Sequence, residues 1–178
     1  MALAIRGRTR RPVLRPQVPE TDEAVDLVFA GLSRQSRFLR FHAPVPRLTG
    51  AMRTGLLAVD GRTHVGLVAE VAGRPVGIGR FVDRGPGHVD LAVAVVDAAQ
   101  GRGVGRRLLE ALGERARELG HPALYGDVLR ENLRIQRLLR SVFPGSTMRW
   151  VDGVLRMTCP LDGPDGLSDE EILAELLS

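Results

Sequence analysis

The order of apolar and polar residues divides the chain into a helical first part and a strand-rich middle. Apolar positions at helical spacing predict a helix over 20–32 and further helical turns over 36–41 and 48–55. Short runs of Val, Leu and Ala predict strands at 13–15, 56–59, 64–71, 75–82 and 88–96. The strands from 64 onward are separated by short turns, so we expect them to pair as an antiparallel meander.

The second half of the pattern alternates strands and helices. It predicts an amphipathic helix over 103–119 that ends at Gly120, a helix over 131–141, and a hairpin of 149–151 and 154–159 that turns at Asp152-Gly153. The helix over 103–119 joins two expected strands, 88–96 and 123–129, and such a crossover makes its strands parallel neighbours. The fold class is therefore α/β (α+β): a mixed, mainly antiparallel sheet of about six or seven strands with helices on both faces.

The length of the chain and the distribution of its charges predict one core domain with a tail at each end. A chain of 178 residues has the size of one domain. We expect an arginine-rich flexible arm at 1–12, a core domain at 13–160, and an acidic tail at 161–178 whose short helix opens on a capping box at Ser168. The first 16 residues hold five arginines and no acid, whereas the rest hold 20 basic and 21 acidic residues. A nearly neutral body does not predict nucleic-acid binding, and the sequence leaves open a homodimer paired through the oppositely charged tails.

Residue types that the chain lacks exclude several chemistries. There is no lysine, which excludes an internal Schiff base and the lysine of a phosphate-binding P-loop. The single cysteine, Cys159, cannot form an internal disulfide, and we expect it in the core. The four histidines show no metal-binding spacing, so no metal is predicted. No run of 18 apolar residues is present, and we expect a cytoplasmic protein without a membrane span.

A glycine-rich turn before the helix over 103–119 is the main candidate for chemistry. It reads Gln100-Gly101-Arg102-Gly103-Val104-Gly105-Arg106-Arg107. Alternate glycines at a helix start leave backbone N–H groups unobstructed, where the helix dipole favours an anion such as a pyrophosphate. The dinucleotide fingerprint would need glycine at position 106. The alternative is a plain connection in a glycine-rich protein.

Two motifs together resemble a known family. The run Val93 to Leu109 resembles the acyl-CoA pyrophosphate loop of the GNAT superfamily of N-acetyltransferases. The run Glu131 to Leu139 resembles its second signature, in which an asparagine opens the last helix; here this is Asn132, the only asparagine in the chain. The resemblance spans about residues 13–160 and is nearest in pattern to the bacterial protein-lysine acetyltransferases. It implies that acetyl-CoA, the co-substrate, lies between two splayed parallel strands, 88–96 and 123–129.

The resemblance implies a role for Asp90, and the sequence offers further candidates for a base. Asp90 stands ten residues before Gln100, at the position of the catalytic glutamate in bacterial protein-lysine acetyltransferases, and Glu70 is the second candidate for a base. The alternatives are that Asp90 caps a loop and that Glu70 faces solvent on a strand. His88 and His42 are candidate auxiliary bases. The expected acetyl-CoA-binding residues are Val93, Ala94, Val95, Gln100, Gly101, Arg102, Gly103, Val104, Gly105, Arg106 and Asn132.

One position departs from the family pattern. Many members place a tyrosine seven residues after the helix-opening asparagine to protonate the departing thiolate, and this chain has Leu139 there. The expected function is an acetyl-CoA-dependent N-acetyltransferase that acts on a primary amine, with a protein lysine as the leading acceptor and a small amine next. The alternative is a catalytically weak acyl-CoA-binding domain that acts as a sensor or interaction module.

Overall fold

The computed structural model describes residues 11–19, 22–151 and 153–161. The predicted tail helix, most of the predicted arm and Asp152 of the predicted hairpin turn lie outside the described residues. No helix among the described residues combines the length and the apolar character needed to cross a membrane.

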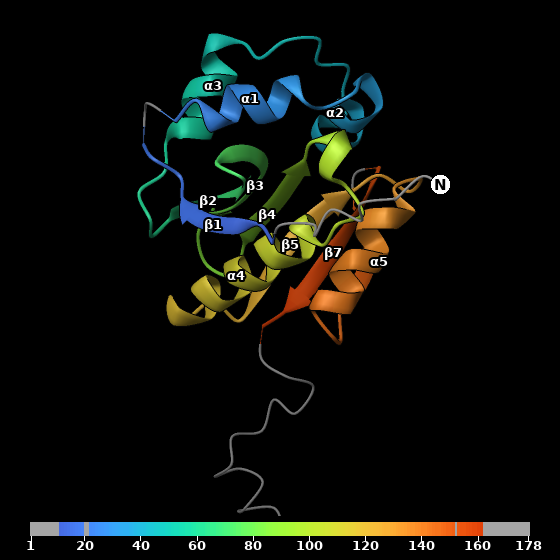
Figure 1. Cartoon of the computed structure of the whole chain (residues 1–178). Helices are drawn as coiled ribbons and strands as arrows, with labels where there is room; N and C mark the ends of the chain where they lie inside the picture. The colour runs from blue at the N-terminus through green and yellow to red at the C-terminus, as the bar shows by residue number, and fades with distance from the viewer. Residues whose placement is uncertain (1–10, 20–21, 152, 162–178) are drawn as a thin grey trace, which may run out of the picture.

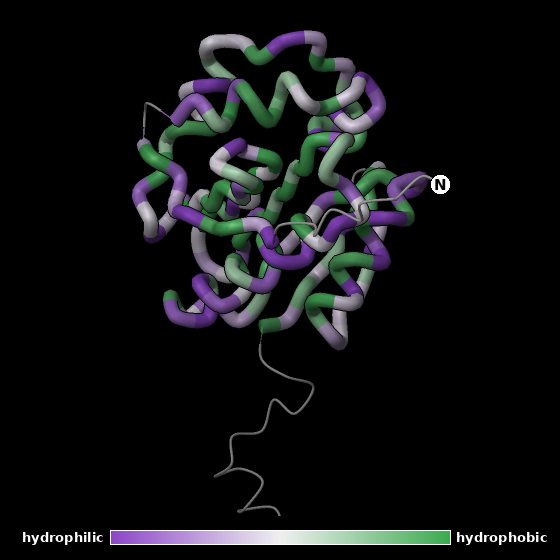
Figure 2. Tube along the Cα trace, viewed as in Figure 1, coloured by the Kyte–Doolittle hydropathy of each residue, from purple (hydrophilic) through white to green (hydrophobic). Residues whose placement is uncertain are grey.

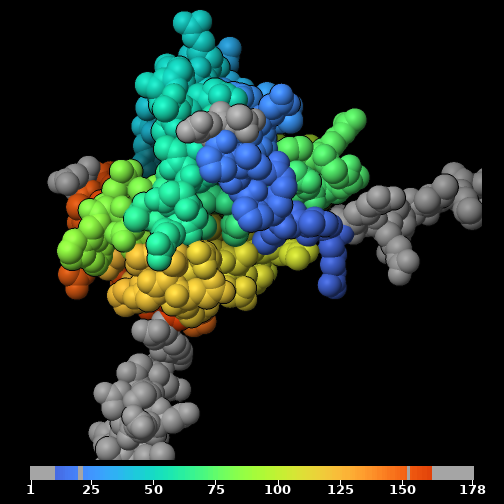
Figure 3. Space-filling view, turned by 90° about the vertical axis from the view of Figure 1, so that its left-hand side faces the viewer, coloured from blue at the N-terminus to red at the C-terminus, as the bar shows by residue number. Residues whose placement is uncertain are grey.

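Seven strands form one mixed sheet, in the spatial order β1-β2-β3-β4-β5-β7-β6. Their bounds are β1 Val13–Pro16, β2 His64–Val71, β3 Arg74–Asp83, β4 Val89–Val95, β5 Ala123–Val128, β6 Thr147–Val151 and β7 Val154–Pro160. All neighbours are antiparallel except β4 and β5, which are parallel. Figure 3 shows one side of the molecule, with the blue segment that contains β1 between the cyan helical region and the yellow to gold region that contains α4. The predicted mixed, mainly antiparallel sheet is confirmed.

Helices cover both faces of this sheet, as predicted. The helices are α1 Ala24–Ala30, α2 Arg34–Phe41, α3 Gly50–Leu57, α4 Val104–Glu118 and α5 Leu133–Val142, with a 3-10 turn, η1, at Asp97–Ala99. Figure 1 shows α1, α2 and α3 grouped at the top of the molecule, and α4 and α5 below them. In β3, a Cβ added at Gly79 would lie 2.8 Å from Cδ1 of Leu112, so this side of the strand faces α4. The alternate residues Ile78, Arg80 and Val82 therefore face the N-terminal helices.

The strand predicted at 56–59 is wrong. Thr49 caps α3 by accepting a hydrogen bond from the N–H of Met52, and the helix continues to Leu57. Leu57 and Val59 are buried because the chain enters the core at the end of the helix. The apolar run therefore reflects burial of a helix end, which a short sequence window does not distinguish from a strand.

The main core lies between the sheet and α4. Leu108, Leu109, Leu112 and Ala116 of α4 are fully buried and form one side of it. Figure 2 shows hydrophobic residues along the central strands and an alternation of hydrophobic and hydrophilic residues in the surrounding segments. Cys159 belongs to this core, as predicted, and burial raises the pKa of its thiol to about 11, which keeps it neutral.

The parallel pair at the centre of the sheet is open. The ladder between β4 and β5 contains one paired position, Asp90 with Tyr125. Beyond that position the two strands no longer pair, as expected for splayed neighbours. The opening places backbone groups of both strands beside a groove.

Candidate active site

The groove at this opening has a volume of about 860 Å³. Its floor is formed by β4 from Asp90 to Val95 and by β5 from Tyr125 to Val128. Residues of α2, α3, α4 and α5 form its walls. A groove of this size, lined by main chain as well as side chains, can hold an extended organic molecule.

The glycine-rich turn lies at one end of the groove. Gly101 has φ 76° and Gly103 has φ 80°, and this left-handed conformation is the one that glycine adopts without steric cost. Gly103 is the N-cap of α4 and provides no side-chain acceptor for the first N–H groups of the helix. These N–H groups and the helix dipole are therefore available to an anion in the groove.

Gln100 fixes the position of the turn relative to its neighbours. Its Nε2 donates to the carbonyl oxygen of Val95 at 3.0 Å and to Asp97 Oδ1 at 3.3 Å. Its Oε1 accepts from Nη1 of Arg134, on α5, at 2.7 Å. Arg134 lines the groove beside the glycines and was not among the predicted site residues, although it stands two residues after Asn132 in the second signature.

The other predicted coenzyme residues fall into two groups. All of them line the groove except Arg102, whose side chain is exposed. Arg106 lines the groove and donates to Ser141 Oγ at 2.8 Å, which connects α4 to α5. Asn132 is the N-cap of α5, as predicted, and its Oδ1 accepts from the N–H of Ile135 at 3.3 Å.

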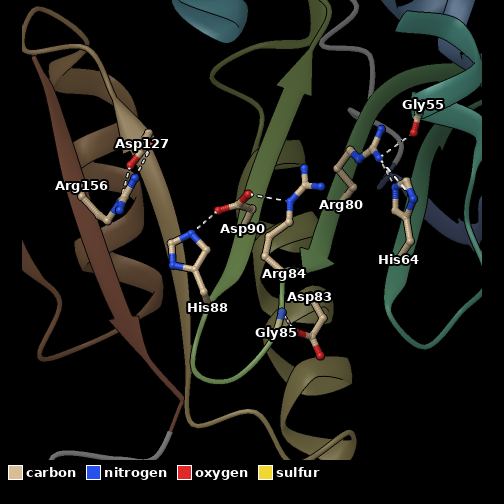
Figure 4. Close-up of polar contacts among 10 residues, drawn as sticks. All are labelled: Gly55, His64, Arg80, Asp83, Arg84, Gly85, His88, Asp90, Asp127 and Arg156. Atoms are coloured by element: carbon tan, nitrogen blue, oxygen red, sulfur yellow. Dashed lines mark hydrogen bonds and ion pairs between the residues drawn. The ribbon is translucent and has the colours of Figure 1, made fainter. Parts of the chain in front are cut away.

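Asp90 is held between two side chains at the other end of the groove. Its Oδ2 accepts from Nε of Arg84 at 3.1 Å, and its Oδ1 lies 2.9 Å from Nε2 of His88. The His88 ring stacks on Tyr125, with the ring centroids 5.2 Å apart. Figure 4 shows Asp90 between Arg84 and His88. The carboxylate keeps 45% exposure and is accessible from the groove.

A second carboxylate, Asp127 on β5, lines the same groove but is paired differently. Both of its oxygens accept from the guanidinium of Arg156, at 2.8 and 2.9 Å. This bidentate hydrogen bond lowers the pKa of Asp127 against the opposing effect of partial burial. Both oxygens of Asp127 are therefore engaged by one guanidinium, which disfavours protonation of this carboxylate.

The structure does not bring Glu70 to the groove. Its carboxylate accepts from Nε of Arg15 at 2.6 Å, and it is not among the groove-lining residues. Arg15 also bonds to Asp22, so Glu70 belongs to a network that joins β1 to β2 and to the start of α1.

Three further candidates have defined positions. His42 lines the groove at the end of α2, whereas His88 contacts Asp90 from outside the lining. Leu139, at the family's tyrosine position, is a buried groove-lining residue without an acidic proton. Among the described residues, no three His, Cys, Asp or Glu side chains lie close enough to hold a metal ion.

A sheet that opens between its parallel strands, with a glycine-rich helix start at one end of the opening, defines the acyltransferase class that the sequence motifs predicted. Comparison with known proteins gives the family. A model of the acetyltransferase (GNAT) family matches residues 32–143, which is more than half of the chain. The chain therefore belongs to the GNAT family of acetyltransferases.

Solved structures with the same fold agree with this assignment. The GNAT domain of Streptomyces lividans PAT is 31% identical, has a TM-score of 0.73, and aligns with 83% of this chain and 89% of its own. The yncA protein of Salmonella typhimurium, solved with acetyl-CoA, is 21% identical, has a TM-score of 0.59, and aligns with 85% and 95% of the two chains. An acetyltransferase of Bacillus subtilis in complex with CoA is 14% identical, has a TM-score of 0.61, and aligns with 84% and 99%.

Proposed function

We propose that this acetyltransferase transfers an acetyl group from acetyl-CoA directly to the nitrogen of a primary amine. The observation that carries the proposal is the arrangement of one groove, with an anion-binding helix start at one end and the carboxylate of Asp90 at the other. This arrangement places a coenzyme site and a proton acceptor on opposite sides of the opening between β4 and β5.

The coenzyme would occupy the half of the groove nearest α4. The N–H groups at the start of α4 suit a pyrophosphate, and Arg106 and Arg134 can add charge-assisted hydrogen bonds. Val93–Val95 pair with β3 on one side and are not paired with β5 on the other, so backbone groups on the open side can hydrogen-bond an extended pantetheine chain as an added strand. The complexes of similar fold with acetyl-CoA and CoA support this assignment.

Asp90 would act as the general base. As the amine nitrogen bonds to the thioester carbon, it loses a proton, and the Asp90 carboxylate can accept that proton directly or through one water. A backbone N–H of β4 can stabilise the oxyanion that forms on the carbonyl oxygen. The carbon–sulfur bond then breaks and the thiolate leaves. With Leu139 in place of a tyrosine, the thiolate takes its proton from solvent, which a thiol pKa of about 8.5 permits.

Arg84 and His88 would position this base. They bond to different oxygens of Asp90, so they restrict its rotation and direct the carboxylate to the groove. Both acceptor classes predicted from the sequence, a protein lysine and a small amine, present the primary amine that this site requires.

Two measurements test the proposed function. Calorimetry should show binding of acetyl-CoA, and a panel of free amines, amino acids and lysine peptides should include acceptors that cause thiol release. Replacement of the groove-lining arginine, Arg106→Glu, should weaken acetyl-CoA binding about tenfold or more, because it places a carboxylate near the phosphates. The matched control Arg62→Glu makes the same charge change at an exposed residue that does not line the groove, and it should bind like the unmodified chain.

The outcomes separate the two functions predicted from the sequence. Binding of acetyl-CoA without thiol release for any amine would favour the catalytically weak sensor or interaction module. Absence of binding to any acyl-CoA would contradict both.

A further inference from the structure

Two arginines line the groove beside Asp90 without a carboxylate partner. Arg80, on β3, is 8% exposed, and its Nη2 donates to the carbonyl oxygen of Gly55 at 3.0 Å and contacts the ring Nε2 of His64. Figure 4 shows Arg80 directed towards His64 and Gly55. Arg40, on α2, has no hydrogen bond or ion pair recorded with a described residue, and it lies over the ring of Phe41, 5.0 Å from its centroid.

These neighbours do not supply a negative charge. Burial and the nearby Arg80 lower the pKa of His64 to about 4, so the ring is neutral at physiological pH. Burial lowers the pKa of Arg40 and that of Arg80 to about 10, and both therefore remain charged at neutral pH. The Gly55 carbonyl, in the last turn of α3, offers Arg80 only the partial charge of a helix end.

The acidic residues of the groove are already paired. Asp90 bonds to Arg84 and His88, and both oxygens of Asp127 bond to Arg156. No other Asp or Glu lines the groove in the described part of the chain. Two neighbouring cations, one buried and one half-buried, reduce stability when no anion is near, and their presence in a binding groove is explained if a ligand supplies the anion.

The register of β3 and β4 places Arg80 at a defined distance along the sheet from the base. Arg80 faces the same side of β3 as Val82, and Val82 pairs with Asp90 across the strands. Positions two residues apart on a strand are separated by about 7 Å. The proposed coenzyme site, by contrast, begins at Val93 and continues towards α4. An acceptor whose amine lies at Asp90 can therefore reach Arg80 through a few bonds, and Arg40 lines the same groove near Arg80.

We propose that Arg40 and Arg80 bind a carboxylate of the acceptor. The acceptor class is then a small amino acid, with its primary amine at Asp90 and its carboxylate a few bonds away, rather than a lysine of a protein. This inference rests on the acetyl transfer proposed above. In the reaction the amine gains the acetyl group as described, and the carboxylate stays unchanged as a binding group.

The test compares amino acids with their amides. The full chain, saturated with acetyl-CoA, is assayed for thiol release with α-amino acids, β-alanine, 4-aminobutanoate, the amide of each, and a lysine peptide. Rates are compared at equal concentrations of unprotonated amine. We expect kcat/KM to be at least about tenfold higher for the best acid than for its amide, because a charge-assisted hydrogen bond contributes that factor or more.

Variants connect this preference to the arginines. Arg40→Gln should reduce the acid-to-amide ratio of kcat/KM about tenfold. The matched control is Arg34→Gln, because Arg34 is an exposed residue of the same helix that does not line the groove, and it should keep the ratio. Arg80→Met should also reduce the ratio, but it removes a buried residue, so the variant of the half-buried Arg40 decides the result if Arg80→Met does not fold.

Several results would overturn the proposal. Equal kcat/KM values for acids and their amides would do so. A kcat/KM for the lysine peptide above that of every amino acid would do so as well. A preference for succinyl-CoA with neutral amines, lost in Arg40→Gln, would place the anion on the acyl donor instead. If the proposed function itself is wrong, no acceptor of any kind releases thiol from acetyl-CoA. That result would contradict both proposals.

Discussion

At the scale of single residues, the position and partners of a carboxylate determine whether it can act as the catalytic base. The sheet carries Glu70 on β2, Asp90 on β4 and Asp127 on β5, and each of these carboxylates is paired with an arginine. Asp90 and Asp127 both line the groove and are partly exposed, but Asp127 holds both oxygens against one guanidinium whereas Asp90 does not. The residue that can accept a proton is therefore selected by its neighbours.

Replacement of this carboxylate by its amide, Asp90→Asn, should lower kcat about a hundredfold or more, because the amide cannot accept a proton from the amine. Binding of acetyl-CoA, measured by calorimetry, should stay within about twofold, since the proposed coenzyme contacts begin at Val93. The control is Asp26→Asn, which removes an exposed ion pair with Arg53 away from the groove. Full turnover by the Asp90 variant would remove Asp90 as the base.

At the scale of elements, the connection from β4 to α4 is formed by backbone geometry and one side chain. Gly101 and Gly103 adopt left-handed conformations that reverse the chain, and Gln100 connects the turn to Asp97 of η1 and to α5. Coenzyme binding at the turn should therefore depend on the glycine backbone as well as on the arginines.

Two alanine substitutions, one in this turn and one at the far end of α4, distinguish an effect on stability from an effect on coenzyme binding. Gly103 and Gly120 have nearly the same φ, 80° and 81°, and a Cβ on either would enter open space. Gly103→Ala and Gly120→Ala should each lower the free energy of unfolding by about 1 kcal/mol, measured in urea. Only Gly103→Ala should weaken acetyl-CoA binding, because its methyl group lies at the helix start that faces the groove. Equal affinities in the two variants would contradict a coenzyme site at this turn.

At the scale of the whole molecule, one ion-pair network connects the first strand to the rest of the fold. Arg15 on β1 donates to Glu70 on β2 and to Asp22 before α1. Asp22 is 6% exposed and also accepts from the N–H groups of Val18 and Ala24. Burial alone would raise the pKa of Asp22, but the hydrogen bond from Arg15 and the two N–H groups lower it below 3.8.

This lowered pKa predicts how stability changes in acid. A carboxylate with a lower pKa in the folded state stabilises the fold above about pH 4, and this contribution is lost as the pH falls through the folded-state pKa. Asp22→Asn should therefore cost about 2 kcal/mol at pH 7, and the difference from the unmodified chain should narrow as the pH falls below 4. Urea unfolding at several pH values measures this. Asp26→Asn, in an exposed pair, should cost less than about 1 kcal/mol, and a pH-independent cost for Asp22→Asn would contradict the linkage.

Features with a local cause could be predicted from the sequence. Asn132 caps the helix that follows it, and the glycines after Gln100 reverse the chain, because both depend on the next few residues. The proximity of Arg40 and Arg80 depends instead on how α2 crosses the sheet, which no short window of sequence encodes. The hydrogen bond between Gln100 and Arg134 is of the same kind, since it joins residues on different elements.

The opening between β4 and β5 gives this sheet four edges instead of two. The outer edges, β1 and β6, are short, with four and five residues, and β1 ends at a proline. They therefore provide few backbone groups with which a strand of another protein could pair. The inner edges face each other across the groove, between the helices that cover the two faces. A strand from another protein cannot easily reach them, whereas a narrow extended molecule can. The same gap that leaves main-chain groups unpaired inside the fold therefore also limits which partners can pair with them.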